Sequence, residues 1–292
     1  MNQDKKTNGR EGTFCLRVAC PDQKGLIAAV TQAVAAEGGN ILDLSQHTAV
    51  DIGTFMLRAV FEKGEKFDEA RFRADFEENY AKRFRMEWSL FDLSVRQRAA
   101  VFVSKTDHCL FEILLQHRDG ELECDIPCII SNHEDLRHVA GSFGVNYYVV
   151  PSDLPKEEQE ARFNEILERE RISLVVLARY MQILRKEFTD LWRGKIINIH
   201  HGFLPAFQGA RPYQRAWEKG VKLIGATAHY ASEDLDQGPI IAQDVVKVDD
   251  GCSVAEFIRM GKDVERRVLL RALKLHLSHR VFVRGPRTFV ME

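Results

Sequence analysis

Residues 195–205 read KIINIHHGFLP, an apolar run that ends in polar residues and a glycine. The run predicts a buried β-strand. Asn198 and His200 lie two residues apart, so their side chains share one face of that strand. Gly202 breaks the pattern and places both side chains at the carboxyl end of the strand, where open α/β sheets bind ligands. A buried polar pair is costly without partners, so it is either a functional site or a strand end that is hydrogen-bonded to a loop.

Strands and helices alternate along the chain before this strand. Apolar runs typical of buried strands and helical patterns follow one another at 99–104, 108–117, 126–131, 134–142, 146–150, 155–171 and 174–178. Such alternation predicts an open, mainly parallel α/β sheet. Longer, partly exposed strands at 226–231 and 240–248 indicate an antiparallel part. A helix over 254–276 and a hairpin around Gly285-Pro286 complete this domain.

The amino-terminal part has a different order of elements. Strands are expected at 13–19, 41–50, 54–61 and 85–91, with a helix from Leu26 to the Gly38-Gly39 stop and another over 67–83. The βαββαβ order predicts a ferredoxin-like unit. Both helices lie on one face of its sheet, so we expect the other face or the edges to drive self-association.

These patterns predict two domains. The ferredoxin-like unit spans residues 12–92, the polar residues 93–98 are a linker, and the α/β domain spans residues 99–292. Residues 1–11 are polar and are expected to be a disordered lead-in.

Composition narrows the class of protein. Of the 292 residues 45% are hydrophobic and 29% charged, and the net charge is −2, as in an ordinary globular protein with no basic field for nucleic acid or membrane. No apolar run approaches the roughly 20 residues that a membrane span needs. The six cysteines form no CxxC pair, which favours reduced thiols and a cytoplasmic location.

A second polar cluster, Ala231-Ser232-Glu233-Asp234-Leu235-Asp236-Gln237-Gly238-Pro239, follows the strand at 226–231. Acidic residues beside Gly-Pro predict a tight loop between two strands. Taken alone, this loop is as consistent with a solvated acidic turn as with a functional site.

Together the motifs NIHH, GATAHY and DLDQGPII, in this order, resemble the folate-dependent formyltransferase family, typified by glycinamide ribonucleotide transformylase. The resemblance covers about residues 97–248 and implies that Asn198, His200 and Asp236 are catalytic. The segment LARYMQIL, residues 177–184, resembles the loop that contacts the pterin ring in that family. The implied substrate-binding residues are Tyr180, Met181, Gln182, Leu184, Ala231, Ser232, Glu233, Leu235 and Gly238.

The amino-terminal unit resembles an ACT domain through DQKGL at residues 22–26 and GGNI at residues 38–41. The resemblance implies a small-molecule site, often for an amino acid. The uncovered sheet face predicts a homodimer or homotetramer. The implied effector-binding residues are Asp22, Lys24, Gly25, Leu26 and Asn40. The alternative is structural, with Gly25 as a turn residue and Asp22 as a helix N-cap.

An ACT-like unit fused to a formyltransferase-like domain resembles the formyltetrahydrofolate deformylase family. This resemblance implies hydrolysis of 10-formyltetrahydrofolate to formate and tetrahydrofolate, which supplies formate and adjusts the one-carbon folate pool. The loop SKTD at 104–107 also favours hydrolysis over formyl transfer to a ribonucleotide. It has no glycine and carries an added acid, so it would bind the phosphate of such an acceptor poorly. The alternatives are formyl transfer to an amine and a non-catalytic folate or amino-acid sensor.

Several further expectations concern the site. No tightly bound cofactor and no metal is expected, because adjacent histidines on a strand face opposite ways and a zinc triad of His200, His201 and His229 is disfavoured. His108, at a helix start, is either a local hydrogen-bonding residue or part of the site. Two residues depart from the deformylase pattern: Gly202 replaces a serine and Gln214 replaces a histidine.

Overall fold

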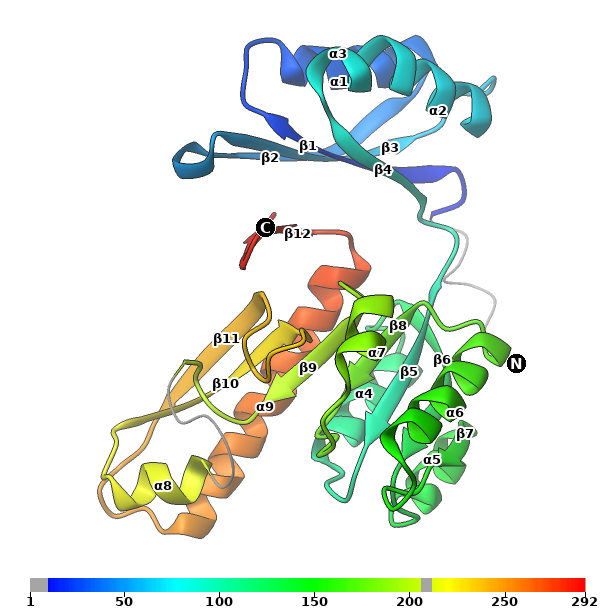
Figure 1. The fold of residues 1–292 in the computed structure, drawn as a ribbon. Coiled ribbons are helices and arrows are strands. Elements are labelled where there is room, and N and C mark those ends of the chain that lie inside the picture. The colour runs from blue at the N-terminus through cyan, green and yellow to red at the C-terminus, as the bar shows by residue number, and fades with distance from the viewer. Residues whose placement is uncertain (1–9, 206–211, 292) are drawn as a thin grey trace. The chain divides into compact units, whose positions relative to one another are not determined.

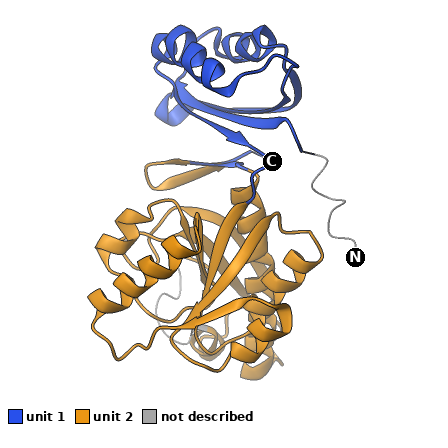
Figure 2. Cartoon of the chain, turned by 90° about the vertical axis from the view of Figure 1, so that its right-hand side faces the viewer, with its two compact units in different colours: residues 1–96, 279–282, 290–292 blue, residues 97–278, 283–289 orange. Residues whose placement is uncertain are grey.

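The structure is a computed structural model that describes residues 10–205 and 212–291. Residues 1–9 of the expected lead-in lie outside this range. The chain forms two compact units (Figure 2): unit 1 contains residues 1–96, 279–282 and 290–292, and unit 2 contains residues 97–278 and 283–289. Within the described ranges, no helix is long and apolar enough to cross a membrane.

Unit 1 has the predicted ferredoxin-like order (Figure 1). Its elements are β1 (Thr13–Pro21), α1 (Leu26–Ala36), β2 (Asn40–Ala49), β3 (Thr54–Glu62), α2 (Glu69–Phe76), a π-helical turn (Glu77–Ala81), α3 (Lys82–Phe84) and β4 (Glu87–Asp92). The strands lie in the order β2-β3-β1-β4 and pair antiparallel. Alternate residues of β1 (Phe14, Leu16, Val18 and Cys20) enter an aromatic-rich core beneath the helices, as the period of two predicted.

The second face of this sheet also receives residues from the end of the chain. Arg17 Nη2 donates to the Val281 carbonyl oxygen at 2.5 Å, and its guanidinium lies 4.2 Å from the Phe282 ring centre. The rings of Phe91 and His279 stack at 3.8 Å. The sequence predicts that the whole end of the chain belongs to the second domain. In the structure only residues 283–289 do, whereas residues 279–282 and 290–292 belong to unit 1, through side chains of β1 and β4 that no local pattern links to them.

Unit 2 contains a seven-stranded sheet in the order β11-β10-β9-β8-β5-β6-β7. Its strands are β5 (Gln97–Val103), β6 (Cys124–Ser131), β7 (Asn146–Val149), β8 (Leu174–Leu177), β9 (Ile196–His200), β10 (Leu223–Tyr230) and β11 (Ile240–Lys247). The five neighbouring strands β9-β8-β5-β6-β7 pair parallel. The pairs β9-β10 and β10-β11 are antiparallel, which confirms the predicted mixed sheet.

The helices of unit 2 are α4 (His108–Arg118), α5 (Arg137–Phe143), α6 (Lys156–Arg169), α7 (Lys186–Leu191), α8 (Pro212–Glu218) and α9 (Val254–Leu277). Phe163 of α6 and Phe188 of α7 pack over Phe102 and Leu177 on one face of the sheet. Helix α9 packs against β10, β11 and α4. The short helices α7 and α8 were not predicted. The hairpin of β12 (Val281–Arg284) and β13 (Arg287–Val290) ends the chain as expected.

Candidate active site

A cavity of about 250 Å³ lies where β8 and β9 end. Its walls come from three segments: the chain after β8, the end of β9, and the loop after β10. The lining residues are Leu177, Arg179, Tyr180, Met181, Gln182, Ile183, Leu184, Thr189, Asn198, Ile199, His200, His201, His229, Ala231, Ser232, Glu233, Asp234, Leu235 and Asp236. The three expected catalytic residues therefore lie together, at the carboxyl edge where α/β sheets bind ligands.

His200 and Asp236 form the central contact. His200 Nδ1 lies 3.1 Å from Asp236 Oδ2, and both side chains are at least nine-tenths buried. No hydrogen-bond partner for the buried His200 Nε2 exists among the described residues. The ring is thus held on one side and has one nitrogen available to a bound substrate.

The environment keeps Asp236 ionised. Burial raises the pKa of its carboxyl group, but the contact with His200 and the nearby His229 outweigh that effect and hold the pKa well below its ordinary value. The backbone of Asp236 is in the left-handed region, with φ 59°, which is uncommon for a residue other than glycine.

Asn198 is positioned by His229 on the neighbouring strand, a contact that the sequence interpretation missed. Asn198 Nδ2 lies 3.1 Å from His229 Nε2, and His229 Nδ1 lies 2.9 Å from the Tyr230 carbonyl oxygen. Because Nδ1 donates to that carbonyl, Nε2 carries the lone pair that accepts from Asn198. One N–H of the Asn198 amide stays available to the cavity.

Gly238 does not line the cavity. A side chain there would place Cβ 1.7 Å from the carbonyl oxygen of Tyr230, so only glycine lets the loop pass this closely. Gly238 therefore holds the loop that carries Asp236, and it is the one residue of the expected substrate-binding set that is absent from the wall.

Hydrogen bonds to polar side chains, two of them buried, hold the segment that is expected to contact a pterin. The backbone N–H of Met181 donates to Ser104 Oγ at 3.0 Å, and Ser104 Oγ donates to Asn132 Oδ1 at 2.7 Å. Gln182 Oε1 accepts from Lys156 Nζ at 3.1 Å. The Met181 bond holds the backbone of one cavity wall, and the Lys156 bond holds the Gln182 side chain, while Met181 is 57% exposed at the rim.

His200 and His201 line the same cavity, with ring centres 5.4 Å apart, so the expectation that they face opposite ways is wrong. The strand ends at His200, and its alternation does not extend to His201. Burial, with the nearby charge of Arg179, lowers the pKa of His201 to about 3, so this imidazole is neutral. A zinc triad stays disfavoured, because the Nε2 atom of His229 already accepts from Asn198 Nδ2 at 3.1 Å.

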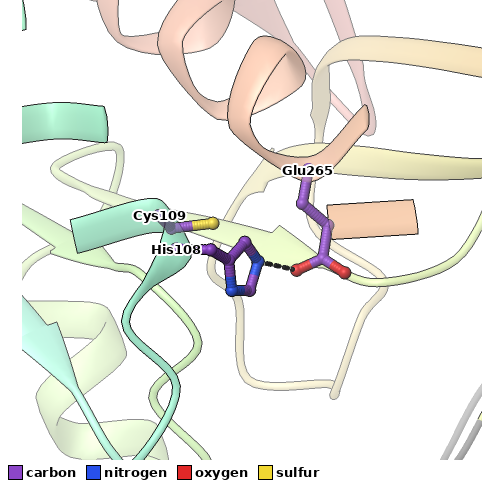
Figure 3. A group of neighbouring side chains, drawn as sticks. All are labelled: His108, Cys109 and Glu265. Carbon is purple, nitrogen blue, oxygen red and sulfur yellow. Dashed lines mark hydrogen bonds and ion pairs between the residues drawn. The ribbon is translucent and has the colours of Figure 1, made fainter. Parts of the chain in front are cut away.

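A buried cluster of His108, Cys109 and Glu265 has the spacing of a metal site (Figure 3). Figure 3 shows the His108 ring directed at Glu265, and His108 Nε2 lies 2.8 Å from Glu265 Oε2. Arg179 Nε lies 3.5 Å from the same oxygen. Burial raises the pKa of Cys109 well above its ordinary value, so the thiol is protonated. A neighbouring guanidinium and a neutral thiol make this cluster a poor cation site.

The two departures from the deformylase pattern lie outside the cavity wall. Gln214 Nε2 donates to Glu218 Oε1 at 3.0 Å on its own helix, and the Gly202 carbonyl accepts from Thr227 Oγ1 at 2.9 Å. Among the described residues, neither Gly202 nor Gln214 forms a hydrogen bond with the side chains of the three central residues.

In unit 1, four of the expected effector residues, at positions 22 and 24–26, lie in the turn between β1 and α1. Asn40 does not join them, because it pairs with Glu62 at the end of the sheet where β1 begins. Gly25 has φ 89° and occupies the N-cap of α1, so the alternative of Asp22 as the N-cap is wrong. The backbone N–H of Asp22 donates to the Gly53 carbonyl at 2.9 Å, Leu26 is buried, and Asn40 begins β2.

Residues 97–273 match the family described as formyl transferase, and residues 16–71 match the ACT domain. The formyltetrahydrofolate deformylase of Synechocystis sp. is 45% identical over 95% of this chain and 98% of its own length. The Bacillus subtilis protein of the same name is 41% identical over 99% of this chain and 97% of its own.

Solved structures agree. The formyltetrahydrofolate deformylase of Pseudomonas syringae aligns over 96% of this chain and 94% of its own, with 42% identity and a TM-score of 0.92. Glycinamide ribonucleotide transformylase 1 of Symbiobacterium toebii aligns over 68% of this chain and 95% of its own, with 29% identity and a TM-score of 0.65. The deformylase resembles nearly the whole chain, and the transformylase only about two-thirds of it.

Proposed function

The chain belongs to the formyltetrahydrofolate deformylase family, and from that premise we propose that Asn198, His200 and Asp236 hydrolyse 10-formyltetrahydrofolate to formate and tetrahydrofolate. The observation that carries the proposal is the 3.1 Å contact from His200 Nδ1 to Asp236, with His200 Nε2 left available in the cavity beside Asn198. An oriented imidazole next to an amide donor suits attack on a formyl carbon.

Catalysis begins with polarisation of the formyl carbonyl. Water attacks the formyl carbon, and the carbonyl electron pair moves to oxygen as an oxyanion. The available N–H of Asn198 donates to that oxygen, a contribution of about 3 kcal/mol where such donors have been removed from other oxyanion sites. His229 already accepts from the other N–H of the same amide nitrogen. Asn198 therefore loses little conformational freedom when it donates to the oxyanion.

The proton then moves through the His200–Asp236 pair. One proton of the attacking water passes to the pair, and His200 Nε2 delivers a proton to N10 as the carbon–nitrogen bond breaks. Tetrahydrofolate leaves with that proton, and formic acid loses its own proton to solvent. Asp236 stays ionised, which keeps the ring of His200 oriented and stabilises its cationic form. The steps balance without a metal or a tightly bound cofactor, and we propose that none takes part.

The folate is proposed to bind along the wall formed by Tyr180, Met181, Gln182, Leu184 and the loop after β10. Two features support this proposal: the backbone at Met181 is held by a hydrogen bond, and the rim is apolar. Both suit a flat ring that is bound by main-chain groups. The loop after β10 is proposed to contact the folate from the other side of the cavity, through Ala231, Ser232, Glu233 and Leu235.

In unit 1, we propose that Asp22, Lys24, Gly25 and Leu26, without the distant Asn40, bind a small effector, and that the chain forms a homodimer or homotetramer. The left-handed Gly25 at the start of α1 supports the effector site, since it presents unpaired backbone N–H groups of the first helical turn. An amino acid is the effector class that the ACT match favours.

Incubation of the purified protein with 10-formyltetrahydrofolate tests the function. Formate should appear in a one-to-one ratio with tetrahydrofolate, with and without a panel of amino acids. His200→Ala should abolish the release, and the exposed His138→Ala should not. Formylation of an added amine in place of formate release would favour a transferase, and folate binding without turnover would favour a sensor.

A further inference from the structure

Arg179 forms part of the buried wall of the active-site cavity, yet the mechanism above gives it no task. It lines the same cavity as Asn198 and His200, and its side chain is 14% exposed. Its buried Nη1 has no hydrogen-bond partner among the described residues. Leaving a guanidinium nitrogen unpaired in a protein interior is costly, so it indicates that the group serves a ligand.

The backbone supports the same reading. Arg179 has φ 64°, in the left-handed region that non-glycine residues seldom adopt. Among the described non-glycine residues, five have a positive φ, and two of these, Arg179 and Asp236, line the cavity. Backbone strain of this kind concentrates at functional sites, where the surrounding structure enforces it.

Glu265 of α9 forms an ion pair with Arg179, without a hydrogen bond to its Nε. Its carboxylate is 1% exposed and lies 3.5 Å from Arg179 Nε. Tyr213 Oη donates to Glu265 Oε1 at 2.6 Å, and His108 Nε2 lies 2.8 Å from Oε2. Burial raises the pKa of Glu265, but the His108 hydrogen bond and the Arg179 charge outweigh it and lower the pKa, so the carboxylate is ionised. Tyr213 and His108 also contact this carboxylate. The Arg179 guanidinium therefore retains N–H groups that can donate to a ligand.

We propose that Arg179, positioned by Glu265, binds the oxygen that water adds to the formyl carbon and stabilises the formate that leaves, which makes water the acceptor. The inference rests on the proposed hydrolysis. Hydrolysis ends with a carboxylate, which a guanidinium binds well. Attack by an amine instead puts positive charge on the new nitrogen, which the same guanidinium disfavours. Arg179 is thus a specificity-determining residue, and Glu265 is a positioning residue.

The first test uses the unaltered protein. Formate binding to its tetrahydrofolate complex is measured by calorimetry and compared with binding of formamide, a neutral molecule of the same shape. We expect formate to bind about 10- to 100-fold more tightly, the range of one charge-assisted bond pair. Equal binding of the two would overturn the proposal, and this arm depends on no variant that must fold.

The second test uses Arg179→Gln, Arg179→Lys and Glu265→Gln, with Arg193→Gln as a matched control on an arginine that is 78% exposed. Arg179→Gln should lower kcat for formate release about 10- to 100-fold with little change in KM for the folate, and abolish the preference for formate over formamide. Arg179→Lys should recover part of both. Glu265→Gln should shift both in the same direction as Arg179→Gln. With hydroxylamine added, the ratio of formylated amine to formate should rise in Arg179→Gln.

The outcomes separate the two proposals. If the unaltered protein releases no formate from 10-formyltetrahydrofolate, the proposed function fails, whatever the variants do. If it releases formate and Arg179→Gln keeps the same kcat and the same formate preference, only the role of Arg179 fails. A purely structural role would lower the unfolding temperature of Arg179→Gln but leave the formate-to-formamide ratio of Arg179→Lys unchanged.

Discussion

Asn198 and His229 face each other in register across β9 and β10, and Asn198 Nδ2 lies 3.1 Å from His229 Nε2. The histidine thus sets the direction of the amide that we assign to the oxyanion. Because the Tyr230 carbonyl fixes the ring of His229 from its other side, the amide has one preferred orientation.

Replacing His229 should therefore impair catalysis without removing a residue of the central trio. We expect His229→Ala to lower kcat about 10- to 100-fold, since an oxyanion donor becomes free to rotate, while KM for the folate changes little. Steady-state formate release measures both constants. His138→Ala, an exposed histidine of α5, is the control. A rise in KM alone would show that His229 serves binding.

Asp236 should make stability depend on pH in the acid range. Its folded pKa is lowered, so its contribution to the free energy of unfolding is fully present above the unfolded value of about 4 and is lost as pH falls through the lower folded value. Urea unfolding of the unaltered protein and of Asp236→Asn is compared from neutral pH downward. The difference between them should be constant above about pH 5 and change below about pH 4. A difference that changes only near neutral pH would contradict the assignment.

Gly238→Ala should displace the loop that carries Asp236. The added Cβ would lie 1.7 Å from the Tyr230 carbonyl oxygen, a backbone atom, so the loop must move. We expect a loss of about 1–3 kcal/mol in the free energy of unfolding and at least a tenfold lower kcat. Gly251→Ala is the matched control, because nothing lies within 4 Å of its Cβ. Normal activity in Gly238→Ala would show that the loop tolerates the shift.

Ser104→Ala should weaken folate binding more than it slows turnover. It removes the acceptor of the partly buried Met181 N–H and the donor to the buried Asn132. Such losses cost about 1–3 kcal/mol, and we expect most of this to raise KM, since the cavity wall loses its support. Ser142→Ala on the exposed side of α5 is the control. A fall in kcat with KM unchanged would place Ser104 in the chemical step.

Local patterns predicted the fold well where one face of an element is buried. The alternation of apolar strands with helical segments was enough for the mixed sheet of unit 2, and the period of two in β1 for the core of unit 1. Asn198 and His200 were predicted by their shared strand face. Asp236 required the family resemblance, because an acidic turn looks the same in isolation.

The rest of the site depends on contacts between distant segments. His108 and Glu265 are 157 residues apart in sequence, so no local spacing links them. A signal for Glu265 did exist, because it shares the apolar face of α9 with Val268 and Leu269 and an acid on such a face calls for a partner. Arg179 had no such signal, since its left-handed backbone and its role in the wall arise from the folded chain.

The packing of Val281 and Phe282 on Arg17 has a consequence for cleavage of the chain. The polypeptide enters unit 2 after Arg96 and returns to unit 1 at His279. It enters unit 2 again for residues 283–289 before it ends in unit 1, so the chain passes between the units four times. A single protease cut between Arg96 and Gln97 therefore yields two fragments, neither of which contains all of unit 1. Such fragments should complement each other and stay associated until the end of the chain is also removed.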